Sequence, residues 1–425
     1  MNTAGRAAIP PAPGEAHIAF LECVECGSRY EAAQAAYVCP DCGLRGILDV
    51  IYDYDRIAAA GAVSREELGR RRDLSQWRYL PLLPVARTDS IPMLQVGWTP
   101  LYRTERLGSA LGLPNLYVKD DGRNPTGSFK DRASALGITR AVEAGAATVA
   151  CASTGNAASS LAGFAAAAGL PACIFVPAGA PAAKVTQLVV FGATVFSVQG
   201  SYDQAYYLCN EAVARYGWYN RNCAVNPYLV EGKKTVGFEI CEQLEFEVPD
   251  WVVFSVGDGC TIAAAWKGFK EFRRLGLIDR LPRMLGVQAE GADPLARAFR
   301  SGNAPVALAA RTAADSIAVG EPRNAAKALG AVRESGGCMV SVGDEAIVEA
   351  IGRVGRHSGI FAEPAGAAGF AGLIDALGSG VVGAGERVVV VVTGNGLKDV
   401  ATAQRVPGKL LEVAPDIKSV AAALG

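Results

Sequence analysis

The sequence contains no uninterrupted apolar run of about 18 residues, so we expect no membrane-spanning helix. Residues 1–14 are rich in Ala, Pro and Gly and lack the apolar core region of a signal peptide, which favours a cytoplasmic protein. The chain also has no excess of positive or negative charge, since its formal net charge is −1. Such a balance gives no electrostatic reason to expect a nucleic acid or an anionic membrane as a partner.

Aromatic residues are scarce, at 8% of the chain, whereas Ala and Gly are abundant. This composition is typical of α/β folds, in which helices pack closely on a sheet. With 425 residues, the chain is long enough for about two or three domains with large cores. A charged fraction of 20% is ordinary for a soluble enzyme.

A disulfide framework is absent as well. The 11 cysteines are an odd number without framework spacing, which predicts reduced thiols in a chain that lacks a secretion signal. Four of them form two Cys-x-x-Cys pairs, each followed by glycine and separated by twelve residues. Four thiolates can close a tetrahedral coordination sphere, which predicts a structural zinc ribbon, or one that once held zinc, rather than a catalytic metal. The predicted ligands are Cys23, Cys26, Cys39 and Cys42.

Beyond residue 97, short apolar runs alternate with helical patterns. This alternation predicts parallel sheets that are covered by helices on both faces. Ligands in such folds bind at the carboxyl ends of the strands. The predicted strands are 116–119, 147–152, 172–176, 194–198, 251–256, 283–288 and 387–392. The predicted helices begin near residues 133, 157, 182, 202, 233, 262, 344 and 363.

The segment 124–132, Asn-Pro-Thr-Gly-Ser-Phe-Lys-Asp-Arg, links a predicted strand to a predicted helix. Ser128 is a candidate N-cap, which places Lys130 in the first helical turn beside Phe129. The positive end of a helix dipole in an apolar setting disfavours an ammonium group, and a Schiff-base lysine must be neutral to attack an aldehyde. The alternative is a surface lysine paired with Asp131.

Three further loops follow predicted strands. Residues 153–156, Ser-Thr-Gly-Asn, precede a helix, and their hydroxyls and amides suit a carboxylate, although N-capping alone accounts for the hydroxyls. Residues 257–261, Gly-Asp-Gly-Cys-Thr, also open a helix and suit a phosphate, provided that Asp258 points away from it. Thr393 begins the third loop, a glycine-rich turn in which its hydroxyl could hydrogen-bond a ring nitrogen.

Taken together, these features resemble the fold-type II pyridoxal-phosphate enzymes, and most closely the threonine synthase family. The resemblance runs from about residue 97 to residue 405. Long threonine synthases, and the similar cysteate synthases, can also carry an N-terminal cysteine segment. The matching segments are 98–101, 124–132, 152–157, 231–235, 288–291, 315–317, 361–365 and 393–399.

The resemblance implies an α/β fold with two three-layer αβα domains, parallel-rich sheets and a small N-terminal zinc-ribbon-like segment. We expect a tail and ribbon at 1–52, a large cofactor-binding domain at 53–140 and 232–425, and a small inserted domain at 141–231. Proteins with this fold are commonly dimers, which implies a homodimer.

The resemblance also implies a role for each candidate residue. Lys130 would form a Schiff base with pyridoxal 5′-phosphate and move protons, Asn156 would contact the ring hydroxyl, and Thr393 would face the ring nitrogen. Ser153 and Thr154 would bind the substrate carboxylate. The whole cofactor-binding set is Phe129, Lys130, Asn156, Gly257, Asp258, Gly259, Cys260, Thr261 and Thr393.

The implied reaction converts O-phosphohomoserine and water to threonine and phosphate by γ-elimination and β-addition. Lys184 is implied to reach the phosphate of this substrate. Two departures from the family pattern concern the same phosphate. Leu229 stands where an arginine is usual, and leucine cannot replace a bidentate cation. The usual Gly-Asn-Pro after residue 317 is replaced by Gly-Glu-Pro-Arg-Asn, so Arg323 is a hypothetical source of the missing charge.

Two alternatives stay open beside this interpretation. One is a related β-replacement enzyme, such as a cysteate synthase that joins O-phosphoserine and sulfite. The other, from a different class, is a non-catalytic ligand-binding homologue that uses its zinc ribbon as a docking surface. The presence of Lys130 argues against the second alternative.

Overall fold

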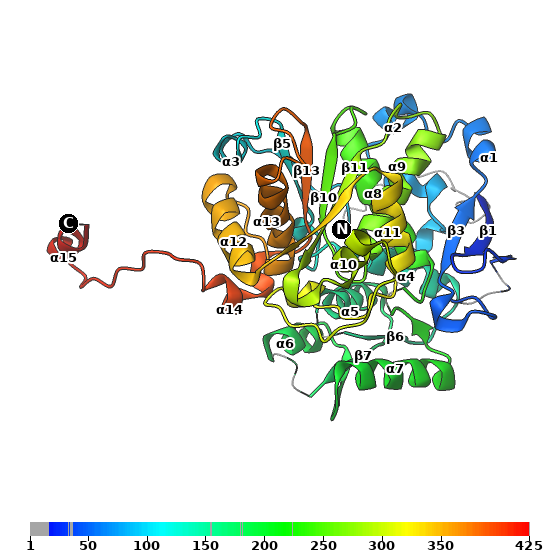
Figure 1. Ribbon diagram of the computed structural model, residues 1–425. Coiled ribbons are helices and arrows are strands. Elements are labelled where there is room, and N and C mark those ends of the chain that lie inside the picture. The colour runs from blue at the N-terminus through cyan, green and yellow to red at the C-terminus, as the bar shows by residue number, and fades with distance from the viewer. Residues whose placement is uncertain are drawn as a thin grey trace, which may run out of the picture.

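The computed structural model describes residues 17–32, 34, 37–153, 155–178, 180, 182–222 and 224–424. These residues form sheets of three, six and four strands. Helices pack around the two larger sheets, and the small sheet lies at one side of the molecule (Figure 1). The α/β class expected from alternating apolar runs and helical patterns is therefore confirmed.

The large sheet consists, in spatial order, of β12 (Cys338–Val342), β11 (Arg283–Ala289), β10 (Trp251–Ser255), β13 (Val388–Val392), β5 (Leu116–Asp120) and β4 (Leu101–Arg103). All neighbouring pairs are parallel except β4 with β5. The five valines of β13 are all buried, because layers of side chains cover both faces of the sheet. β4 and β12 were not expected, since β4 has only three residues and β12 is partly exposed.

Alternate residues of the large sheet enter two separate hydrophobic cores. In β10, Val252 and Phe254 belong to one core and Val253 belongs to the other. On the first side lie α8 (Tyr228–Gln243), α9 (Cys260–Arg274), α10 (Pro294–Ser301) and α11 (Ala325–Glu334), and on the second lie α3 (Glu105–Leu111), α12 (Asp344–Ser358) and α13 (Pro364–Gly378). The sheet is thus the middle of three layers, as expected.

The four-stranded sheet is entirely parallel and has the order β8 (Thr194–Val198), β7 (Ala172–Pro177), β6 (Val149–Ala152) and β9 (Tyr219–Asn220). One face packs on α4 (Lys130–Glu143), α5 (Asn156–Ala168) and α6 (Ala182–Val190), and the other packs on α7 (Tyr202–Tyr216). The predicted insert at 141–231 contains this whole sheet, while its boundaries stay a prediction.

One helix begins clearly earlier than its sequence pattern predicts. α8 begins at Tyr228 rather than near residue 233. Asn226 Oδ1 accepts a hydrogen bond of 3.1 Å from the N–H of Tyr228, and Pro227 already has a helical φ of −65°. The remaining helices are α1 (Tyr54–Ala59), α2 (Arg65–Arg70), α14 (Val400–Ala403) and α15 (Ile417–Leu424).

Four charged side chains form a buried cluster behind the first turn of α4. Arg132 pairs with Asp121 (Nε–Oδ2, 2.6 Å) and with Glu239 (Nη1–Oε1, 2.5 Å). Lys119 also pairs with Glu239 (Nζ–Oε2, 2.7 Å). All four side chains are 0% exposed, so their charges are neutralised by one another and not by water. The cluster therefore ties β5, α4 and α8 together.

The three-stranded sheet is antiparallel and packs directly on the large domain. Asp49 accepts hydrogen bonds from Lys267 on α9 and from Lys327 on α11, each at 3.0 Å. Leu48 and Val50 belong to the same hydrophobic core as α8 and α9. The strands, in spatial order, are β2 (Arg29–Tyr30), β1 (Ile18–Cys23) and β3 (Leu48–Tyr52).

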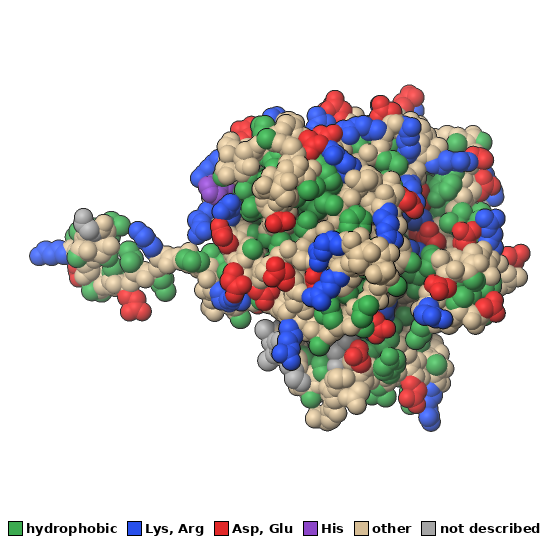
Figure 2. Space-filling view, viewed as in Figure 1, with side chains coloured by type: hydrophobic (Ala, Val, Ile, Leu, Met, Phe, Trp, Pro, Cys, Tyr) green, Lys and Arg blue, Asp and Glu red, His purple; other side chains and the backbone are tan. Residues whose placement is uncertain are grey.

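The C-terminal segment leaves the body of the protein and ends in α15, far from the sheets (Figure 1). Its apolar side chains are exposed, with Leu410 at 92% and Ile417 at 78%, and Figure 2 shows hydrophobic side chains along it. Neither α15 nor any other helix within the described ranges is long and apolar enough to cross a membrane.

Candidate active site

Lys130 lies where the loop after β5 meets the loop after β13. Phe129 donates its N–H to the carbonyl of Thr393 (2.9 Å), and Asn395 donates its N–H to the carbonyl of Gly127 (3.0 Å). Because β5 and β13 are parallel neighbours, both loops leave the same edge of the sheet. The fold thus brings Lys130, Phe129 and Thr393 together.

The expectation that Ser128 caps α4 was wrong. Phe129 precedes the helix without a side-chain cap, and Ser128 Oγ is buried with no hydrogen-bond partner among the described residues. Asp131 instead accepts a hydrogen bond from the N–H of Thr126 (2.6 Å), and burial raises the pKa of Asp131. Because Asp131 is fully buried, the alternative of a surface ion pair with Lys130 is also wrong.

A cavity of about 760 Å³ opens between the two larger sheets at this edge. Its lining includes five of the predicted site residues, namely Lys130, Ser153, Asn156, Asp258 and Arg323. Other predicted residues that the structure describes lie outside the lining, namely Phe129, Lys184, Gly257, Gly259, Cys260, Thr261 and Thr393. Thr154 falls outside the described residues.

The loop after β6 contributes a helix N-terminus to the cavity. Gly155 donates its N–H to Ser153 Oγ (3.2 Å), and α5 begins at Asn156. Asn156 Nδ2 donates to Glu363 Oε1 (2.7 Å) and to Ser316 Oγ (3.4 Å). Unpaired amides and a hydroxyl at the start of a helix suit a carboxylate.

Glu363 is a buried carboxylate that our sequence reasoning did not single out. Burial raises its pKa, against the lowering effects of Lys130 and Lys398. A Cβ on Gly394 would lie 2.1 Å from Glu363 Oε1, so only glycine fits beside this carboxylate. The segment 361–365 matched the family pattern without receiving a role, and its acidic residue before a helix-opening proline was the available signal.

The loop between β10 and α9 presents a second helix N-terminus. α9 has no acidic residue in its first turn, and Gly259 precedes it with a left-handed φ of +87°. A Cβ on Gly259 would lie 2.5 Å from the Cβ of Ala328, so this loop packs tightly on α11. Asp258 Oδ1 accepts a hydrogen bond of 3.2 Å from the N–H of Arg323. The helix dipole and its first amides suit a phosphate.

The two cations predicted to bind the substrate phosphate already have acidic neighbours. Lys184 forms an ion pair with Asp315, and burial lowers the pKa of Lys184. Arg323 lies with Cζ 4.2 Å from the ring centre of Tyr206 and with Nη2 3.9 Å from Asp203 Oδ1. These acids offset part of the positive charge that each cation offers an incoming anion.

Leu229, where the resemblance led us to expect an arginine, is buried against α4. A Cβ on Gly137 would lie 2.8 Å from Leu229 Cδ2, so the two helices are in direct contact here. Arg221 and Asn222, which no sequence pattern singled out, line the cavity. They follow β9, which has only two residues and therefore lacks a recognisable apolar run.

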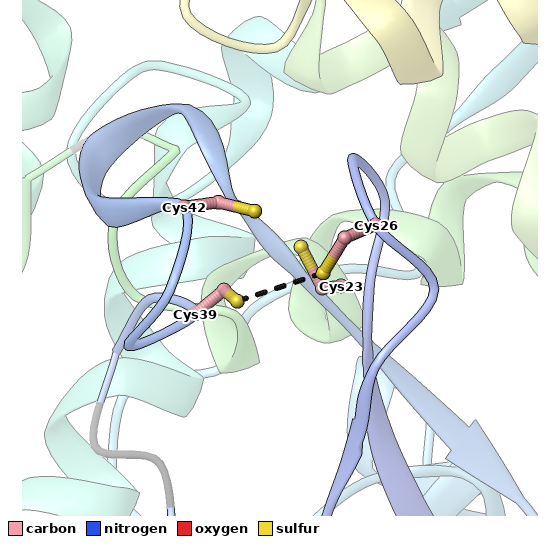
Figure 3. A group of neighbouring side chains, drawn as sticks. All are labelled: Cys23, Cys26, Cys39 and Cys42. Carbon is pink, nitrogen blue, oxygen red and sulfur yellow. Dashed lines mark hydrogen bonds between the residues drawn. The ribbon is translucent and has the colours of Figure 1, made fainter.

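The predicted zinc ligands Cys23, Cys26, Cys39 and Cys42 converge, with their sulfur atoms within 4.8 Å of one another (Figure 3). The sulfur atoms of Cys26 and Cys39 are 3.8 Å apart, which is about the edge of a tetrahedron with Zn–S bonds of ~2.3 Å. Gly27 and Gly43 have left-handed φ values of +72° and +59°, as the turns after the two cysteine pairs require. The donor set therefore fits zinc.

Comparison with known proteins gives the same cofactor class. A family model described as "Pyridoxal-phosphate dependent enzyme" matches residues 93–394. The chain is 46% identical to a threonine synthase of Methanosarcina acetivorans, over 90% of this chain and 93% of the relative. It is 44% identical to a threonine synthase of Methanocaldococcus jannaschii, over 93% of this chain and 96% of the relative.

Solved structures of other proteins share the fold. Maize serine racemase is similar with a TM-score of 0.62 and 24% identity, over 70% of this chain and 88% of that one. The processed form of threonine deaminase isoform 2 from Solanum lycopersicum is similar with a TM-score of 0.61 and 24% identity, over 72% of this chain and 86% of that one. At such low identity, these similarities establish the fold alone.

Proposed function

We propose, since the chain belongs to the threonine synthase family of pyridoxal-phosphate dependent enzymes, that it converts O-phosphohomoserine and water to threonine and phosphate. Such an enzyme is a pyridoxal-phosphate dependent lyase. The observation that carries the proposal is the cavity that places Lys130 beside the helix-opening loop of Ser153 and Asn156. A lysine and a carboxylate-binding helix N-terminus are what an amino-acid substrate of this cofactor requires.

Pyridoxal phosphate, when bound, supplies an electron sink that stabilises negative charge on the substrate carbons near the amine. We assign Lys130 to the bond with the cofactor and to moving protons at the Cα and Cβ atoms of the substrate. We assign Asn156 to the ring hydroxyl and Thr393 to the ring nitrogen. A neutral hydroxyl at that nitrogen does not stabilise a protonated ring, which favours elimination and replacement over transamination.

The anionic groups are assigned to the helix N-termini around the cavity. Residues 257–261 hold the cofactor phosphate at the start of α9. Ser153 and Thr154 bind the substrate carboxylate at the start of α5. Lys184 and Arg323 are assigned to the substrate phosphate, and of these two Arg323 lines the cavity.

The proposed function is tested with the purified, cofactor-loaded enzyme and O-phosphohomoserine, by measuring released phosphate and threonine. O-phosphoserine with sulfite is assayed in parallel, because the buried Leu229 removes a cation that the family usually has. We expect equal amounts of phosphate and threonine from the first substrate. Cysteate from the second reaction and no turnover in the first would identify a β-replacement enzyme instead. Absence of turnover in both would favour a non-catalytic ligand-binding homologue.

We also propose that Cys23, Cys26, Cys39 and Cys42 hold a structural zinc ion. Metal analysis should give about one zinc per chain, because four thiolates close a tetrahedral site. Cys26→Ser should lose the metal and lower the melting temperature, while Cys338→Ser, which changes a cysteine outside this cluster, should keep it. Full zinc content in Cys26→Ser would contradict this assignment.

The oligomeric state and the location of the protein are proposed from the family resemblance and the sequence. We propose a homodimer in the cytoplasm. Light scattering on the cofactor-loaded enzyme measures the mass directly, and a mass equal to the monomer mass of 44.1 kDa would exclude the dimer.

A further inference from the structure

The guanidinium of Arg221 is a buried positive charge inside the cavity. The side chain is 1% exposed and lines the same cavity as Lys130. Its Nη2 atom is buried and makes no hydrogen bond with any described residue, and no carboxylate of those residues forms a salt bridge with it. An unpaired buried charge is costly in free energy, so a site of this kind is completed by an anion.

The position of Arg221 relative to the catalytic lysine is fixed by two contacts. Its Nε donates to Ser134 Oγ (3.1 Å), and its backbone N–H donates to the carbonyl of Ala150 (2.9 Å). Ser134 is four residues after Lys130 on α4, so the two side chains are neighbours on one face of that helix, with Cβ atoms about 5–6 Å apart. The Nε bond uses one edge of the guanidinium, and Nη2 has no hydrogen-bond partner among the described residues.

The neighbouring strand ends place Arg221 beside the carboxylate loop. β9 and β6 are parallel partners, so residue 221 and Ser153 follow the carboxyl ends of adjacent strands. Asn222 Oδ1 accepts a hydrogen bond of 2.8 Å from the N–H of Ala152, which fixes the two strand ends to each other. The guanidinium and the carboxylate loop therefore face one substrate molecule from the same side of the cavity.

We propose that Arg221 binds the phosphate of the substrate. This inference rests on the proposed function, in which the substrate carries a carboxylate and a phosphate and the cofactor carries a second phosphate. Helix N-termini are assigned to the carboxylate and to the cofactor phosphate, so the substrate phosphate depends on side-chain cations. Lys184 and Arg323 are offset by Asp315 and Asp203, whereas Arg221 has no such acid among the described residues. A guanidinium also matches phosphate oxygens in geometry.

The test compares Arg221→Gln and Arg221→Lys with the wild type, all in the cofactor-loaded form so that the cofactor phosphate already occupies its own loop. Inorganic phosphate and threonine are titrated separately by calorimetry. Arg221→Gln should weaken phosphate binding about 10- to 100-fold, because a charge-assisted hydrogen bond is lost, and should change threonine binding little. Arg221→Lys should retain part of the phosphate affinity, because lysine keeps the positive charge. It should not retain all of it, because lysine cannot form the two parallel hydrogen bonds of a guanidinium.

Thermal unfolding without ligand gives a readout that a purely structural arginine would not produce. Arg221→Gln should melt no lower than the wild type, because an unpaired buried charge is removed. Added phosphate should raise the melting temperature of the wild type and leave that of the variant unchanged. Arg140→Gln, which alters an arginine in the last turn of α4, is the matched control and should respond to phosphate as the wild type does.

Three results would overturn the assignment. Unchanged phosphate affinity in Arg221→Gln would exclude phosphate binding by this residue. An equal loss of threonine affinity would assign the guanidinium to the substrate carboxylate instead. A large loss of stability that phosphate does not influence would make Arg221 structural. If the enzyme does not convert O-phosphohomoserine but phosphate binding still depends on Arg221, the proposed function fails and the anion site stands.

Discussion

Lys130→Ala is expected to lower the turnover of O-phosphohomoserine about 1,000- to 10,000-fold, because the proposed enzyme loses its proton carrier and its bond to the cofactor. Lys130 is the first residue of α4 and faces the cavity, so the substitution removes the amine without disturbing the loop bonds of Phe129 and Asp131. The variant should also lose the visible absorbance of lysine-bound cofactor while keeping its melting temperature.

The variant Lys130→Arg tests whether a positive charge at this position is sufficient for activity without a nucleophilic amine. Arginine keeps a cation at this position but stays protonated, so it cannot attack an aldehyde and should be as inactive as alanine. Lys270→Ala is the control, because Lys270 lies exposed on α9 and its ion pair is with the exposed Glu334. Substantial turnover by Lys130→Ala would remove this residue from the proposed mechanism.

Glu239→Gln should lower the free energy of unfolding by about 3–5 kcal/mol, which is the usual cost of removing one partner from a buried ion pair. Glu239 neutralises Lys119 and Arg132, and all three side chains are 0% exposed. Denaturant unfolding measures the loss. Glu349→Gln, which breaks an exposed pair with Arg353, should change stability by less than about 1 kcal/mol. Similar effects of the two substitutions would show that the buried cluster contributes little.

The same carboxylate predicts how stability depends on pH. Burial alone would raise the pKa of Glu239, but Arg132 and Lys119 lower it from 4.5 to about 2. Because the folded-state pKa lies below the unfolded-state value, the stabilisation is present above pH 4.5 and is lost as the pH falls toward 2. The difference corresponds to about 3 kcal/mol. Glu239→Gln should therefore show a shallower loss of stability over this range than the wild type.

Much of the fold could be predicted from the sequence, because long apolar runs report buried parallel strands. β13 is five consecutive valines, and β10, whose five residues are all buried, lies within the predicted run 251–256. Very short strands gave no such signal. β9 has two residues, and Arg221 escaped notice because it follows that strand. Arg221 stands out because its side chain is buried and its Nη2 atom has no hydrogen-bond partner among the described residues. Neither property can be seen in a local sequence pattern.

In the candidate site, too, some residues could be predicted from the sequence and others could not. Lys130, Ser153 and Asn156 lie in, or directly after, loops that follow apolar strands, so the topology alone predicts that they meet. Glu363 lies in a loop after no predicted strand and reaches Asn156 through a contact between residues that are far apart in the chain. Ser128 failed as a cap because the backbone of its loop is held by the loop after β13. Such long-range contacts override local capping preferences.

The pairing of Asp49 with Lys267 and Lys327 bears on how this family can change in evolution. Asp49, on the three-stranded sheet, pairs with cations on the two helices that pack around the proposed cofactor-phosphate loop, since α9 follows that loop and Gly259 contacts α11. Lys267 also pairs with Glu231 on α8. A descendant that lost this sheet would leave Lys327 without this acid, whereas Lys267 would keep Glu231. We therefore expect proteins without the sheet to carry a neutral residue at the equivalent of 327, or a new acid beside it. The sheet is then inherited together with the helices that it contacts.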